Sequence, residues 1–74
     1  MFKCTAVFRQ KLNEETYHFD LVDPRNNFIV GYIVVNRVTK KDVISSSEEL
    51  DAIQRNEIFQ SALEQANLIK DVEG

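Results

Sequence analysis

The sequence predicts a small α+β domain: a three-stranded antiparallel β-meander followed by one long or two shorter C-terminal helices, which pack on one face of the sheet. Two observations support this class. Residues 1–38 contain three segments rich in alternating or apolar strand formers, with turn signals between them. Residues 45–70 contain no proline or glycine and open on a helix-start pattern. With 74 residues, the chain has room for a single domain, 1–74.

The first two strands are expected to form a hairpin. The first strand runs to about Lys11, and a second alternating run covers residues 16–22. Asn13-Glu14 is the expected two-residue loop, and a four-residue loop would leave the same side chains on each face. This register places Phe8 opposite Phe19.

The third predicted strand, residues 28–38, is the most apolar segment of the chain, and both of its faces are apolar. A turn at residues 23–27 precedes it, with a proline and two asparagines. Pairing Asp23 with Phe28 places Tyr32 on the core face and Ile33 on the reverse face. The core predicted from these registers and from the helical pattern consists of Phe8, Phe19, Leu21, Val30, Tyr32, Phe59, Ala62 and Ile69.

The helical region is expected to begin at the serine run 45–47. Ser45 with Glu48, or Ser46 with Glu49, matches the serine-x-x-glutamate capping box. Leu50 and Ile53 point away from the stripe that begins at Ile58, because each helical residue turns the side chain by about 100°. One long helix with two stripes and two shorter helices both satisfy the pattern.

Composition indicates a soluble intracellular protein. No apolar run approaches the roughly 20 residues that cross a bilayer, and the first residues do not resemble a signal peptide. The single cysteine cannot form an internal disulfide, which fits a reducing compartment. The predicted location is therefore the cytoplasm, with no membrane association.

Charge is unevenly distributed along the chain. The net charge of −3 divides into +2 over residues 1–44, from seven basic and five acidic residues, and −5 over residues 45–74, from two and seven. The sheet half is mildly basic and the helical half acidic, which is typical of a solvated helical face.

Catalytic chemistry is not indicated by the sequence. Cys4 and His18 could suggest a thiol nucleophile and its base, but the predicted hairpin places them on opposite faces of the sheet. The two glycines, at positions 31 and 74, cannot build a phosphate-binding loop. We therefore expect no enzyme activity, no cofactor and no metal site.

The leading functional prediction is a non-enzymatic protein–protein interaction module, either a homodimer or an adaptor or inhibitor that docks on a larger partner. The apolar reverse face and the free edge of the third strand would make the contact. The predicted partner-binding residues are Val22, Ile29, Ile33, Val35, Arg37, Leu50 and Ile53.

The alternative prediction is a nucleic-acid-binding regulator that uses the mildly basic side of the sheet. A sheet can enter a groove or support single-stranded bases, and basic residues supply the contacts to phosphate. The residues that would bind nucleic acid are Lys3, Arg9, Lys11, Arg37, Lys40 and Lys41.

Overall fold

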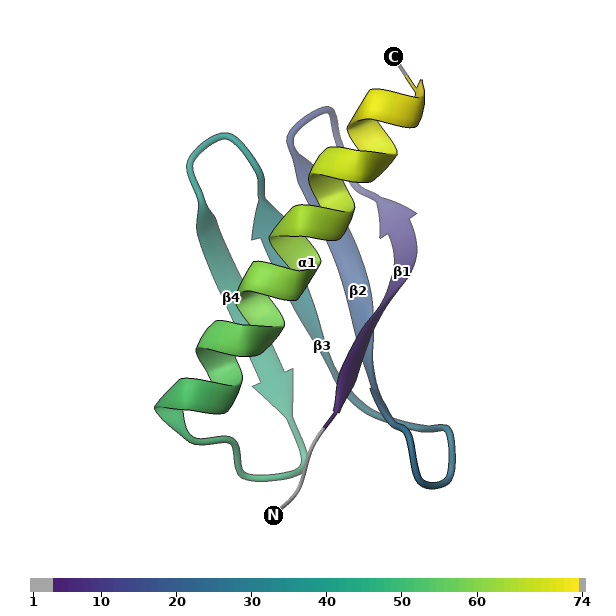
Figure 1. The fold of residues 1–74 in the computed structure, drawn as a ribbon, viewed down its shortest axis with the longest axis vertical. Helices are drawn as coiled ribbons and strands as arrows, with labels where there is room; N and C mark the ends of the chain where they lie inside the picture. The colour runs from purple at the N-terminus through teal and green to yellow at the C-terminus, as the bar shows by residue number, and fades with distance from the viewer. Residues whose placement is uncertain (1–3, 74) are drawn as a thin grey trace.

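A four-stranded antiparallel sheet and one C-terminal helix make up the fold of the computed structural model, which describes residues 4–73. The predicted α+β class is confirmed. The elements are β1 (Thr5–Lys11), β2 (Thr16–Asp23), β3 (Phe28–Asn36), β4 (Lys41–Ser46) and α1 (Ala52–Glu73). Each strand pairs with its neighbour in the sequence, in the order β1-β2-β3-β4. The helix crosses one face of the sheet diagonally and starts near the end of β4 (Figure 1).

Asparagine stabilises both hairpin turns that flank β3, by adopting a positive φ in one and by accepting backbone hydrogen bonds in the other. In the β2–β3 turn, Asn27 adopts a positive φ of 63°, and its backbone N–H donates to the Asp23 carbonyl over 2.7 Å. In the β3–β4 turn, the Asn36 side-chain oxygen accepts from the backbone N–H groups of Val38 and Thr39, both at 2.9 Å. The turn predicted at residues 23–27 is confirmed.

The prediction of three strands was wrong, because residues 41–46 form a fourth. β4 pairs with β3 from Asn36–Lys41 to Gly31–Ser46. The third strand is therefore an interior strand, and its predicted free edge does not exist. β4 and β1 form the edges instead.

The predicted helix start at residues 45–47 was also wrong. Ser45 and Ser46 belong to β4, and the helix begins at Ala52. Asp51 caps it: the Asp51 carboxylate accepts from the Gln54 N–H over 2.8 Å, and the Gln54 side chain accepts from the Asp51 N–H over 3.2 Å. This is the reciprocal capping box that was expected five or six residues earlier.

A single helix resolves the alternative that the sequence left open. The conflict of helical phase disappears because Leu50 precedes the helix and is buried, whereas Ile53 lies on the exposed side of its first turn. Ile58, Ala62 and Ala66, four residues apart, face the sheet and are buried.

A β-bulge at Val30 decides which side of β3 faces the helix. Val22 pairs with Ile29, but the preceding β2 residue, Leu21, pairs with Gly31, so Val30 is an extra residue in β3. Because side chains alternate along a strand, one extra residue exchanges the two faces for the rest of the strand.

The predicted faces of β3 were consequently wrong beyond the bulge. Ile33 and Val35, predicted on the reverse face, are 0% exposed among the residues that pack against α1. Tyr32, predicted in the core, is 39% exposed on the other side of the sheet.

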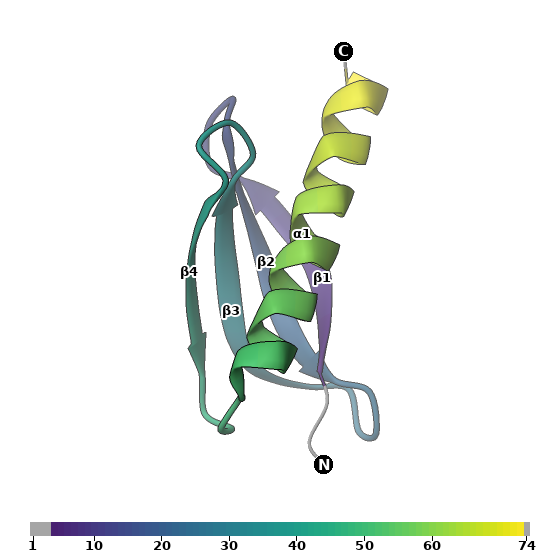
Figure 2. The ribbon, with the colours of Figure 1, turned by 60° about the vertical axis from the view of Figure 1, so that its left-hand side comes forward.

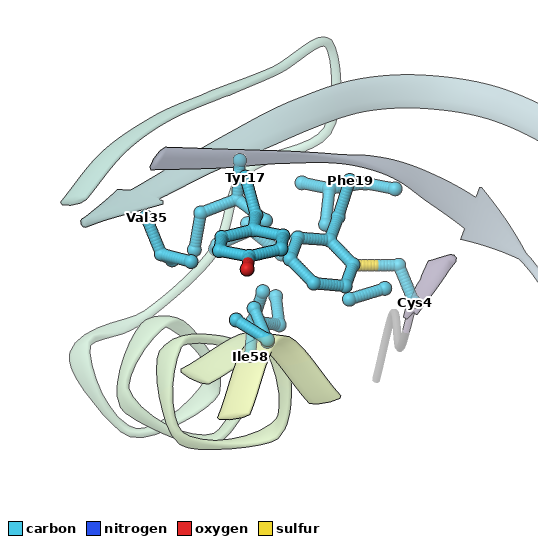
Figure 3. Packing of buried hydrophobic residues seen from close by; sticks show 11 residues of the cluster. Cys4, Tyr17, Phe19, Val35 and Ile58 are labelled. Atoms are coloured by element: carbon cyan, nitrogen blue, oxygen red, sulfur yellow. The ribbon is translucent and has the colours of Figure 1, made fainter. Parts of the chain in front are cut away.

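The core lies between the sheet and the helix, and Figure 3 shows Tyr17 and Phe19 side by side between β2 and Ile58. Among the predicted core residues, Phe19, Leu21 and Ala62 are buried. Val30, Phe59 and Ile69 are half-buried and pack against the same cluster. Phe8 lies at the margin, with its ring centroid 5.7 Å from that of Phe19. The buried cluster consists of Cys4, Ala6, Tyr17, Phe19, Leu21, Ile33, Val35, Leu50, Ile58, Ala62 and Ala66.

Candidate interaction surface

One face of the sheet lies against α1, and no element within residues 4–73 covers the other, as Figure 2 shows from the side. We call this second surface the open face. It follows from the strand registers, because residues paired across neighbouring strands share a face. The open face consists of Thr5, Val7, Gln10, Thr16, His18, Asp20, Val22, Ile29, Tyr32, Val34, Asn36, Lys41, Val43 and Ser45, together with the bulge residue Arg9, which pairs with Asp20.

Apolar side chains occupy both sides of the open face. Val7 on β1 is 47% exposed and Val43 on β4 is 62% exposed. Between them on β3, Tyr32 is 39% exposed and Val34 is half-buried. Together with the half-buried Val22 on β2, apolar side chains occur on all four strands, and His18 and Asp20 lie between them.

The polar groups at the centre of the open face compensate one another. The Asp20 carboxylate lies 3.1 Å from Nη1 of Arg9 and 3.7 Å from Nε2 of His18. The His18 ring also contacts Tyr32, with 5.5 Å between centroids and 44° between planes. Asp20 and His18 are partly shielded, whereas the Arg9 side chain is mostly exposed. The centre of the face therefore carries little uncompensated charge.

The two residues that could have suggested thiol chemistry lie apart. Cys4 is buried in the core on the helix side, and His18 lies on the open face. Burial raises the pKa of the Cys4 thiol, and the nearby Asp23 carboxylate raises it further. A protonated, buried thiol on the opposite side of the sheet from its supposed base cannot form a nucleophile–base pair with it.

An ion pair closes the β2–β3 turn next to this cysteine. Nη2 of Arg25 lies 2.7 Å from Oδ2 of Asp23, and the Arg25 backbone N–H donates to Oδ1 over 2.9 Å. These hydrogen bonds lower the pKa of Asp23. Asp23 is almost fully shielded by its neighbours, and the pair already explains its ionised state. We assign it to turn stability.

The structure separates the predicted partner-binding residues. Val22 and Ile29 pair on the open face, as expected. Ile33, Val35 and Leu50 are buried in the core, so the prediction that they form a contact surface is wrong for this fold. The remaining two lie elsewhere: Arg37 in the β3–β4 turn, and Ile53 exposed on the helix.

The basic residues predicted to bind nucleic acid form no continuous patch. Arg9 is paired with Asp20 on the open face, and Nζ of Lys11 lies 3.5 Å from Glu14. Lys40 lies in the β3–β4 turn with a positive φ of 61°. Arg37 and Lys41 lie near that turn, and Lys3 lies outside the described residues.

Tyr32, Val34 and Val43 are open-face residues that the sequence did not assign to the site. Tyr32 was placed in the core because the bulge was not taken into account, and Val34 lies on the same face as Tyr32. A signal was present: Gly31 often marks a bulge or a close approach of backbones. Val43 was missed together with β4.

Hollows in the surface do not suggest a built ligand site. The hollow between β1 and the start of α1 has a volume of about 220 Å³, below the usual range for small-molecule pockets. A shallower depression of about 490 Å³ lies between β4 and α1. Within residues 4–73, no group of three or more His, Cys, Asp or Glu side chains is placed to hold a metal ion.

Comparison of the chain with protein-family models, with curated proteins and with solved structures gives no match. Among the described residues, no helix is both long and apolar enough to span a membrane.

Proposed function

We propose that the protein is a protein–protein interaction module whose contact surface is the open face. The observation that carries this proposal is that apolar side chains from all four strands lie on the side of the sheet opposite α1, where no described element covers them. Single exposed apolar residues are normal in soluble proteins, but several on one sheet face are typical of an interaction site.

The chemistry of the open face supports a protein partner. Tyrosine and valine side chains supply apolar contact area, while the Arg9–Asp20 pair and His18 supply hydrogen-bonding groups in the middle. Interaction surfaces often combine such an apolar area with a few oriented polar groups.

Nucleic-acid binding is the second candidate, and one observation favours it. The bulge places Tyr32 beside His18 on the open face, where two rings could stack on bases. Against it, Arg9 is already paired with Asp20, and Lys40 and Lys41 lie at one end of the sheet, so no basic track follows the two rings. We therefore rank protein binding first.

Site-specific photo-crosslinking in the native host tests the proposal. A photoreactive phenylalanine analogue at Val43 should give protein adducts, whereas the same analogue at Ile53, which is 71% exposed on the helix, should give few. Adducts from position 53 alone, or none from either position, would contradict an open-face contact.

A nucleic-acid control accompanies this experiment. Fluorescence anisotropy with labelled single-stranded and duplex DNA and RNA should show no binding at low salt. Binding that weakens steeply between 50 and 200 mM salt, as expected for phosphate contacts, would favour the second candidate.

A further inference from the structure

We infer that the partner of the open face is a second copy of this chain, and that two open faces pack against each other around a two-fold axis. This inference rests on the proposed function, because it names the occupant of the same surface. Three features support it: the irregular and charged sheet edges, the low net charge at the centre of the open face, and the area of that face.

The sheet edges are poorly suited to extending the sheet. On β1, Nε2 of Gln65 donates to the Ala6 carbonyl over 3.1 Å, and the register with β2 is interrupted between Phe8 and Gln10. On β4, Lys41 and Asp42 place charged side chains at the start of the strand. Irregular registers, occupied backbone groups and edge charges all oppose strand addition. The flat open face is therefore the better surface for association.

The charge of the open face permits packing against an identical face. Two like-charged surfaces repel each other, so a face used for self-association needs little net charge at its centre. Here Asp20 is compensated by Arg9 at 3.1 Å and approached by His18 at 3.7 Å. A second copy would present the same Arg9–Asp20 pair and the same valine side chains, so neither face would repel the other.

The area of the open face is close to what a specific dimer requires. Strands about 4.8 Å apart, paired over about six residues at about 3.3 Å each, give a four-stranded face of roughly 400 Å² in projection. Side-chain relief raises the accessible area above this projection, so two copies would bury roughly 1,000 Å² in total. This lies just below the roughly 1,200–2,000 Å² of stable specific interfaces, in the range of weak and transient ones. We therefore expect a dimer that dissociates on dilution through the micromolar range.

The strand order determines the contacts of such a dimer. Two packed sheets keep their strands approximately aligned, and a two-fold axis parallel to the strands satisfies this condition. An axis midway between β2 and β3 places β1 over the partner's β4, and β2 over the partner's β3. Val7 then lies near Ser45 of the partner subunit, because Val7, Asp20, Tyr32 and Ser45 form one cross-strand row. Asp20 faces Tyr32 of the partner subunit, since both belong to one cross-strand row.

The test combines oligomeric state with charge complementation. Wild-type protein should sediment as a dimer at high concentration and as a monomer after dilution. The double variants Val7→Glu/Ser45→Glu and Val7→Lys/Ser45→Lys, at two exposed positions, should each be monomeric, because like charges would meet across the interface. A one-to-one mixture of the two should restore the dimer, because each glutamate would then face a lysine.

Two controls separate loss of association from loss of folding. Both positions are exposed, so the variants should retain the wild-type circular dichroism spectrum and a cooperative melting transition. Ile53→Glu and Leu68→Glu change exposed helix residues outside the open face and should leave the dimer intact.

Several results would overturn the inference. These are a wild-type monomer at every concentration, a dimer that survives both double variants, or a dimer lost in Ile53→Glu. Failure of complementation in the mixture also counts against the two-fold arrangement. A wild-type monomer that still gives Val43 adducts with other proteins would refute self-association alone, whereas absence of all open-face adducts would refute the proposed function as well.

Discussion

Gly31→Ala should strongly destabilise the protein, because the backbone of β4 occupies the space where a β-carbon would lie. A Cβ at position 31 would overlap the Ser45 carbonyl oxygen and approach the Ser46 Cα to 2.7 Å. Both contacts are with backbone atoms, so a side-chain rotation cannot relieve them. The chain is held there by the Ser47 N–H, which donates to the Val30 carbonyl over 2.8 Å.

The expected loss of stability can be estimated from these contacts. Forcing an extra methyl group into a packed site costs about 1–3 kcal/mol. Displacing the end of β4 would also weaken the Ser47–Val30 hydrogen bond, which contributes about 1 kcal/mol. We expect a total of about 3 kcal/mol. A domain of 74 residues has a free energy of unfolding of roughly 4–11 kcal/mol, so the variant should remain folded but with a much smaller margin.

Urea unfolding followed by circular dichroism measures this effect. The midpoint for Gly31→Ala should fall well below that of the wild type, while the control Val43→Ala, at an exposed position of β4, should change the stability by less than about 0.5 kcal/mol. The sign is decisive. If position 31 had free space, alanine would restrict the unfolded chain and stabilise the protein by about 0.4–1 kcal/mol. A midpoint equal to or above that of the wild type would therefore refute the close approach of β4.

Three further outcomes are expected. Asp51→Ala should lower the free energy of unfolding by about 1 kcal/mol, because the helix loses its N-cap. The control Ser45→Ala, on the open face, should have little effect. Equal losses of stability in thermal melts of the two variants would argue against the cap. Tyr17→Phe should melt at or above the wild-type temperature, because the buried Tyr17 hydroxyl has no hydrogen-bond partner among residues 4–73; a clear loss would indicate a partner for that hydroxyl. The lowered pKa of Asp23 means that its pair with Arg25 stabilises the fold above the unfolded pKa of about 3.9 and is lost as pH falls through the folded pKa. Arg25→Gln should therefore be less stable than the wild type at neutral pH, and the difference should close in acid; a constant difference in pH-dependent melts would contradict this linkage.

The sequence predicted those parts of the fold that depend on local pattern. Phe8 does lie opposite Phe19, and Asp23 pairs with Phe28 across the expected turn. In β2, and in β1 as far as Phe8, one face is mostly apolar and the other mostly polar, so alternation alone determines which side is buried.

Alternation could not determine the faces of β3. Both sides of this strand are apolar, so Ile33 and Tyr32 were equally suitable for the core by hydrophobicity. The bulge at Val30 determines that Ile33 faces the core and Tyr32 faces away from it. The position of this bulge depends on where the β2–β3 register accommodates one extra residue. The predicted reverse face therefore has the wrong β3 residues beyond the bulge.

The fourth strand was missed for a different reason. β4 is a six-residue edge strand, and only Val43 and Ile44 in it are apolar. Such a segment is stabilised by its pairing with β3 rather than by its own pattern. Two of the serines that resembled a helix cap, Ser45 and Ser46, instead pair with β3, and Asp51 caps the helix.

The order of the elements, with α1 after all four strands, has a consequence during synthesis on the ribosome. The meander pairs only neighbouring strands, and isolated hairpins form in about 1–10 μs. Translation of the 22 helical residues takes roughly 1–4 s at about 5–20 residues per second. During that interval Phe19, Leu21 and Ile33 have no helix to cover them, so the nascent sheet exposes apolar residues on both faces. We expect the nascent chain to be most prone to capture by chaperones, or to premature association with another copy, in the seconds before α1 emerges.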